Sequence, residues 1–158
     1  MIDLREVEAV PGGQARALWL LSTALVLSTT TWFSATAVIP QLRVELSISD
    51  GVAAWLTIAV QLGFVAGALI SSITTLTDVM PVRLVLISSS LLAALANLGL
   101  LQAESAGALI AFRFATGFFL AGVYPPAVKL LSTWFKARRG TALGILVGAL
   151  TLGTAAPH

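Results

Sequence analysis

The 158-residue sequence combines 58% hydrophobic residues with only 10% charged residues and has no cysteine. Soluble domains average about 25% charged residues, so this composition indicates an integral membrane protein. The missing cysteines exclude a disulfide framework, a thiolate metal site and a cysteine nucleophile, while the net charge of +2 matters less than where the charges fall.

The apolar runs are long enough to cross a bilayer, because a spanning helix needs about 20 predominantly apolar residues. Four complete runs and part of a fifth are predicted at 17–39, 52–76, 82–101, 106–131 and 140–158. A helix cannot end in mid-bilayer with unpaired carbonyl groups, so we expect the N-terminal part of a longer protein. The predicted fold is an all-α, polytopic transmembrane helical bundle, with a leader at 1–16 and a transmembrane region at 17–158.

The leader is predicted to remain attached and to lie in the cytoplasm. A cleaved signal peptide is disfavoured because the first run is about 23 residues long and acidic residues precede it. Lysine and arginine gather in the leader, the second connection and the fourth connection, whereas Arg43 is the single basic residue of the other connections. By the positive-inside rule, we expect a multi-pass protein of the cell membrane with a cytoplasmic N-terminus.

A polar and aromatic face is predicted on the first run. It is formed by residues at helical spacing, namely Thr29, Trp32, Phe33 and Thr36. One interpretation is the wall of a substrate cavity. The other is ordinary packing, in which the threonines bond their own backbone and the aromatic rings pack on neighbours or lie at the interface.

Polar and small residues in the second and third runs favour helix packing. For Gln61 and Asn97, an interhelical hydrogen bond is favoured over ligand binding, although Gln61 is kept as a candidate cavity residue. Glycines at Gly63 and Gly67, and a second stripe from Gly140, allow close approach of helix backbones. Sliding of these helix faces past one another is compatible with the same spacing.

Arg113 places a charge inside the fourth run. It lies seven residues beyond Ala106, or roughly 10 Å deep at 1.5 Å per residue, where an unpaired charge is costly. Snorkelling to the interface is one interpretation. A cavity wall is the other, because Gly117 and Tyr124 share the face of Arg113 and leave room beside its guanidinium. The predicted runs contain no aspartate or glutamate that could carry a coupling proton.

Three stretches resemble the major facilitator superfamily of transporters. "TTLTDVMPVRLVL" is similar to the loop signature G-x-x-x-D-R-x-G-R-R between the second and third spans, and matches it at Asp78 and Arg83. "RFATGFFLAGVYPP" resembles the R-F-x-x-G pattern of the fourth span, with Arg113 and Gly117 in place. "STWFKARRGTALG" resembles the connection into the fifth span. The chain therefore resembles the N-terminal half of such a transporter from about Leu18 to His158.

The resemblance implies two six-span halves, with the substrate bound between them near the midplane and exposed alternately by rocking of the halves. The candidate substrate contacts are Arg113, Tyr124, Gly117, Thr29, Trp32, Phe33, Thr36 and Gln61, and the gating loop contains Asp78 and Arg83. The expected partners are a small-molecule substrate, a coupling ion such as a proton, the lipid bilayer and the C-terminal half of the same transporter. We expect no cofactor, metal or nucleic acid.

The predicted function is secondary active transport of a small solute by a rocker-switch mechanism. A small organic anion is favoured, since Arg113 has no carboxylate beside it in this part of the chain and a substrate anion could pair with it. A carboxylate in the C-terminal half is the other candidate partner. Proton-coupled drug efflux is the alternative, although "LGTAAPH" lacks the order of the antiporter signature G-P-x-x-G-G. A structural or assembly subunit would leave Arg113 unexplained. An enzyme is disfavoured because the sequence has one histidine, His158, and no carboxylate in its apolar runs. The sequence contains no P-loop motif, so nothing in it indicates ATP as the energy source.

Overall fold

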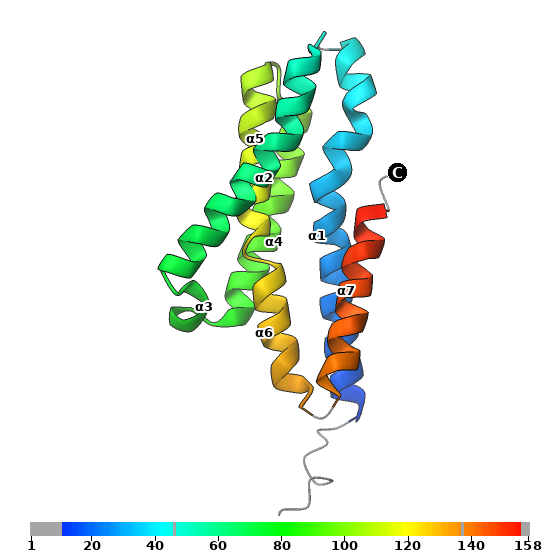
Figure 1. Ribbon diagram of the computed structural model, residues 1–158, viewed down its shortest axis with the longest axis vertical. Coiled ribbons are helices and arrows are strands. Elements are labelled where there is room, and N and C mark those ends of the chain that lie inside the picture. Colours follow the sequence, from blue (N-terminus) through cyan, green and yellow to red (C-terminus); the bar gives the residue numbers. More distant parts are fainter. Residues whose placement is uncertain (1–10, 46, 137, 156–158) are drawn as a thin grey trace, which may run out of the picture.

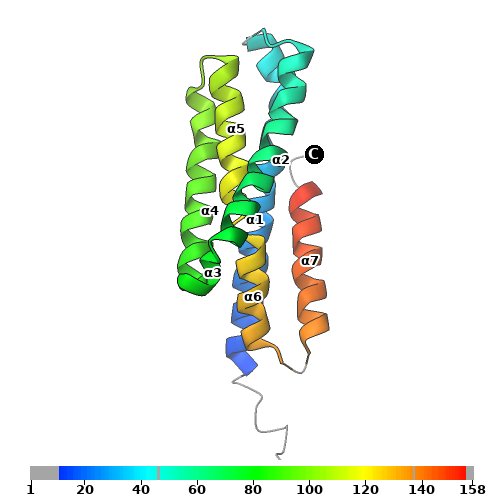
Figure 2. The same cartoon turned by 60° about the vertical axis from the view of Figure 1, so that its left-hand side comes forward.

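The computed structural model describes residues 11–45, 47–136 and 138–155, and every regular element within them is a helix. The elements are α1 (Pro11–Glu45), α2 (Asp50–Ile73), α3 (Leu76–Val79), α4 (Val82–Gly99), the 3₁₀ helix η1 (Leu100–Gln102), α5 (Ala106–Leu120), α6 (Tyr124–Trp134) and α7 (Arg139–Ala155). The long helices form an up-and-down bundle (Figure 1). In it α2 and α4 pack on α5, and α1 packs on α7 (Figures 1 and 2).

Four segments are long and apolar enough to cross a membrane. They are Gly12–Gln41, Asp50–Ile73, Val82–Gln102 and Ala106–Trp134, while Arg139–Ala155 is a shorter apolar helix. These segments confirm the predicted transmembrane helical bundle. Helix α1 begins at Pro11, before the predicted run, because proline fits the first turn of a helix and the helix extends beyond its apolar part.

The fourth predicted run is not one continuous helix, because α5 ends at Leu120 and α6 begins at Tyr124. Pro125 and Pro126 have no backbone N–H, so they cannot donate to the carbonyl groups one turn earlier, and their rings crowd that turn. The sequence already contains the cause of the break in its Tyr-Pro-Pro segment. As a result, Tyr124 is the first residue of a new helix, α6, in the middle of the bundle.

Helices α2 and α5 pack backbone against backbone at three glycines. A Cβ atom at Gly117 would overlap the carbonyl group of Val60, and Cβ atoms at Gly63 and Gly67 would overlap those of Phe114 and Phe118. The packing interpretation of Gly63 is therefore confirmed. At Gly140, in contrast, a Cβ atom would have no described atom within 4 Å, so this stripe makes no close helix contact within the described part of the chain.

The predicted gating loop contains α3 and is tied to α6 by charge. The Asp78 Oδ1 atom lies 2.5 Å from the Lys129 Nζ atom, which also donates a hydrogen bond to the Thr77 carbonyl at 2.9 Å. Arg83 is exposed and forms no ion pair with a described residue. Lys129 on α6 therefore fixes the position of this loop.

Thr75, just before α3, is expected to be a strained position. Its backbone lies in the left-handed region, at φ 46° and ψ 40°, where a residue with a Cβ atom is disfavoured by about 1–2 kcal/mol and glycine is not. We expect Thr75→Gly to raise the thermal unfolding midpoint in detergent. Thr77→Gly, in the helical turn that follows, should lower it. An unchanged or lower midpoint for Thr75→Gly would show that the position is not strained.

Candidate functional site

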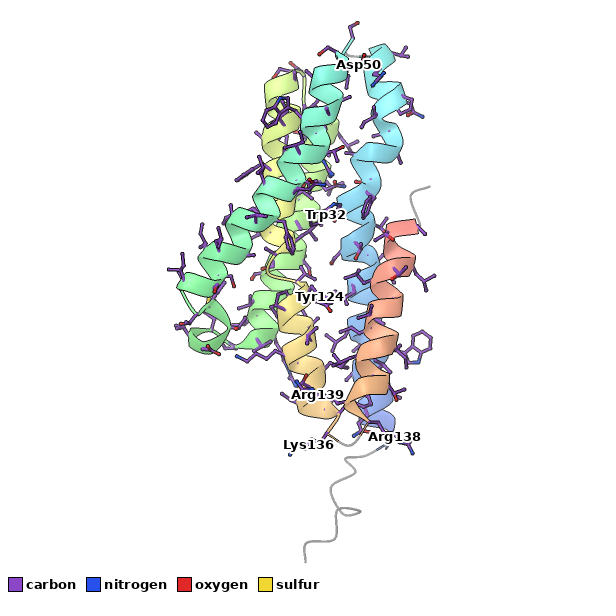
Figure 3. The ribbon with its side chains drawn as sticks, in the orientation of Figure 1. Trp32, Asp50, Tyr124, Lys136, Arg138 and Arg139 are labelled. Carbon is purple, nitrogen blue, oxygen red and sulfur yellow. The ribbon has the colours of Figure 1, made fainter. Side chains whose placement is uncertain are left out.

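A cavity of about 250 Å³ lies at the centre of the bundle. Helices α1, α2, α7 and the α5–α6 junction line it with Leu25, Ser28, Thr29, Trp32, Phe33, Phe64, Leu120, Val123, Tyr124, Leu150 and Thr154. None of these residues is charged. Figure 3 shows Trp32 and Tyr124 at mid-height, between Asp50 at one end of the bundle and Arg138 and Arg139 at the other. The cavity is therefore central and mainly apolar.

Helix α1 supplies the largest share of the wall because of its sequence spacing. Its lining residues recur at i, i+3, i+4, i+7 and i+8 from Leu25, which places them on one helix face. The structure thus brings Thr29, Trp32 and Phe33 together with Tyr124 in one cavity. All four were candidate substrate contacts on sequence grounds.

Aromatic packing fixes the Trp32 ring. Its centroid lies 5.1 Å from that of Phe64 in an edge-to-face arrangement with an interplanar angle of 65°. Phe33 is a second neighbour at 6.4 Å. Such pairs add about 0.5–1.5 kcal/mol beyond burial, so the indole forms a preorganised part of the wall.

The polar groups of the cavity fall into two sets. The Thr29 and Thr154 hydroxyl groups donate to carbonyls of their own helices, at 2.7 Å to Leu25 and 2.6 Å to Thr151, so the local-bonding interpretation of Thr29 is confirmed. The second set comprises the Trp32 indole N–H, the Tyr124 phenol and the Ser28 hydroxyl, which form no hydrogen bond with a described residue. These donors remain available to a bound solute.

Arg113 does not line this cavity. Its side chain is only 1% exposed, so it does not snorkel to the interface. The guanidinium donates to the carbonyl groups of Leu56 at 3.3 Å, Thr31 at 3.3 Å and Trp32 at 2.5 Å. Arg113 therefore joins α5 to α2 and to α1, directly behind the residue that forms the aromatic wall. Among the described residues, no carboxylate pairs with it.

Two other candidates, Gly117 and Gln61, also lie away from the cavity. Gly117 sits at the α2–α5 crossing. Gln61 is exposed on α2 and forms no hydrogen bond with a described residue, so the predicted interhelical bond is not found there. The corresponding prediction for Asn97 is confirmed, because its Oδ1 atom accepts from the Ser34 hydroxyl at 3.0 Å. The side chain of Thr36 lies outside the described part of the structure.

Among the lining residues, sequence reasoning missed Ser28 on α1, Phe64 on α2, and Leu150 and Thr154 on α7. No sequence signal marked Phe64, because it is an apolar residue in an apolar helix and the nearby Gln61 does not line the cavity. None marked α7 either, because its glycine spacing suggested packing. Among the described residues, no group of three or more His, Cys, Asp or Glu side chains could hold a metal ion.

Comparison with known proteins places the chain in a family. Residues 21–156 match the family model for the Major Facilitator Superfamily, which is most of the chain. No curated protein sequence and no solved structure gives a significant match.

Proposed function

The chain belongs to the major facilitator superfamily, and on that premise we propose that it binds a small organic solute in the central cavity and moves it by alternating access. Members of this superfamily are membrane transporters for small molecules rather than enzymes, and the helices are those of a multi-pass membrane protein. In the proposed mechanism, an ion or solute gradient supplies the energy, and rocking of two halves around the site exposes it to either side.

The observation that carries the proposal is a mainly apolar cavity with unused hydrogen-bond donors. Its aromatic wall suits a solute with an apolar or aromatic body. The indole N–H of Trp32, the phenol of Tyr124 and the hydroxyl of Ser28 suit an acceptor such as a carboxylate or a carbonyl. A structural subunit would have no use for a central cavity with free donors.

The charge of Arg113 supports an anionic solute. It lies behind the wall at Trp32 and has no carboxylate partner among the described residues. In a medium of low dielectric constant, its positive potential extends into the cavity, which favours an anion over a cation. In this proposal Arg113 positions α1 and makes the electrostatic potential in the cavity positive. The residues that contact the solute are Trp32, Phe33, Thr29 and Tyr124.

Efflux of a neutral drug is the second candidate function, because no charged side chain lines the cavity. A neutral apolar compound would gain the same aromatic contacts without depending on Arg113. Uptake that falls for carboxylates but not for neutral analogues in Arg113 variants would support the anion. Equal effects on both would support the neutral drug.

We propose a cytoplasmic N-terminus in the cell membrane. The basic residues Arg138 and Arg139 lie at the end of the bundle where α1 begins (Figure 3), in agreement with the positive-inside rule. Residues 1–16 would form a cytoplasmic leader and residues 17–158 would belong to the first half of the transporter. A C-terminal half would close the cavity from the opposite side, and the loop with Asp78 and Arg83 would gate its inner end.

Removing single donors from the cavity is expected to weaken substrate binding. A net hydrogen bond contributes about 0.5–1.5 kcal/mol, so Tyr124→Phe and Trp32→Phe should each raise the KM for uptake of an acceptor-bearing carboxylate several-fold. Transport into proteoliposomes by the complete transporter measures this change. Trp55→Phe is the matched control, because Trp55 is half exposed on α2 and does not line the cavity. Equal KM values for all three variants would refute a binding role for these donors.

A further inference from the structure

A second hollow of about 440 Å³ adjoins the cavity, toward the end of the bundle that carries Arg138 and Arg139 (Figure 3). It is lined by Tyr124, Pro125, Val128, Lys129, Ser132 and Arg139. The α6 residues recur every four positions from Tyr124 and from Pro125, so one face of α6 forms the wall. Tyr124 lines both hollows. A solute that leaves one hollow for the other would therefore pass this ring.

The two cations of the second hollow differ in their partners. Lys129 is paired with Asp78 at 2.5 Å, so the charges of this pair cancel. Arg139 is exposed and forms no ion pair with a described residue. Helix α7 begins at Arg139, and the free N–H groups of its first turn add positive partial charge at the same place. The uncompensated positive charge of the hollow thus centres on Arg139.

We propose that this second hollow binds the anionic head of an amphipathic solute, with Arg139 as the residue that selects for the charge. The planar guanidinium can hold a carboxylate or a phosphate through two parallel hydrogen bonds. The apolar body of the solute then fits the neighbouring cavity beyond Tyr124, whose wall carries no charge. Head and body are thus recognised in different hollows. Passage of the solute through the membrane rests on the proposed function, whereas binding of the head does not.

An anionic group such as a carboxylate or a phosphate occurs both in soluble solutes and in lipid head groups, so the experiment tests a soluble anion and an anionic lipid. The complete transporter is placed in nanodiscs of phosphatidylcholine, and binding of 4-phenylbutyrate is measured by calorimetry beside its uncharged amide. Arg139→Gln is expected to weaken 4-phenylbutyrate binding about tenfold, the usual scale for a hydrogen bond to a charged group, and to leave the amide unchanged. Arg138→Gln is the matched control, since Arg138 is also exposed but does not line the hollow.

Nanodiscs that contain phosphatidylglycerol form the lipid arm. If a lipid head enters the hollow, phosphatidylglycerol should compete with 4-phenylbutyrate in the parent protein and not in Arg139→Gln. Native mass spectrometry should then show retained phosphatidylglycerol that is lost in Arg139→Gln alone. Either the binding difference or this retention supports the site and identifies the source of the anion.

Arg139→Gln with unchanged 4-phenylbutyrate binding and unchanged lipid retention would overturn the proposal. Failure of the proposed transport function is a separate result, because it would appear as absent uptake into proteoliposomes while Arg139-dependent binding persists.

Discussion

Replacing Arg113 with methionine is expected to leave the protein folded but to lower uptake of organic anions about tenfold, because the anion in the cavity would lose the Coulomb attraction of the buried charge behind the wall. Methionine fills similar space, and it does not carry the desolvation cost of a buried charge, which offsets the loss of the Arg113 hydrogen bonds. The carbonyl groups that accept from Arg113 belong to helices, where each also accepts a backbone amide. Arg113→Met therefore removes the positive electrostatic potential from the cavity with little loss of packing.

Two further variants separate charge from geometry. Arg113→Lys keeps the charge but cannot reach three carbonyl groups on two other helices with a planar fork, so partial uptake is expected. Arg113→Ala leaves a cavity at a side chain that is 1% exposed, and large-to-small changes of this kind destabilise by about 2–5 kcal/mol. Thermal unfolding midpoints and uptake rates of the transporter in proteoliposomes measure both effects.

The order of uptake expected for anions is parent, then Arg113→Lys, then Arg113→Met. Parental uptake by a folded Arg113→Met variant would remove the electrostatic role and leave only the packing role. A methionine variant that unfolds like the alanine variant would instead show that the hydrogen bonds to α1 and α2 hold the bundle together.

Gly117→Ala is expected to destabilise the bundle strongly. The added Cβ atom would meet the Val60 carbonyl, which is backbone and cannot rotate away. Helices α2 and α5 would have to separate, at a cost of about 1–3 kcal/mol or more for overpacking. The thermal unfolding midpoint and the monodisperse fraction in detergent should both fall.

Gly107→Ala is the matched control for this change. Gly107 lies on the same helix, where an added Cβ atom has no described atom within 4 Å, and alanine has the higher helix propensity. The control should therefore be neutral or slightly stabilising. If Gly117→Ala were as stable as Gly107→Ala, the close backbone contact of α2 and α5 would be wrong.

The sequence was sufficient to predict the spans and one wall of the cavity. Length and hydropathy define each spanning helix independently of its neighbours, because every backbone polar group must be paired within the helix. The face containing Thr29, Trp32 and Phe33 could be predicted because helical spacing is a local property. Tyr124 was included for the same reason, although its role at a helix break depends on Pro125.

The partners of each face could not be predicted, because they depend on how helices rotate against one another. Arg113 was predicted to face a cavity, yet its guanidinium bonds three backbone carbonyl groups that carry no residue-specific signal. The pairing of Lys129 with Asp78 joins residues 51 positions apart. Phe64 was missed because an apolar residue in an apolar helix looks the same whether it faces lipid or a cavity.

The central claim is that the midplane cavity receives solute from water, and a direct measurement is possible because these 158 residues contain no cysteine, so labelling can be compared with that of the parent protein. Ser28→Cys places a thiol on the cavity wall, and Thr116→Cys places one at a position that is 0% exposed on α5. Labelling with a charged, membrane-impermeant methanethiosulfonate reagent in proteoliposomes should modify Ser28→Cys, be slowed by a transported solute, and leave Thr116→Cys unmodified. An unreactive Ser28→Cys, or one labelled at a rate that no solute changes, would contradict the account.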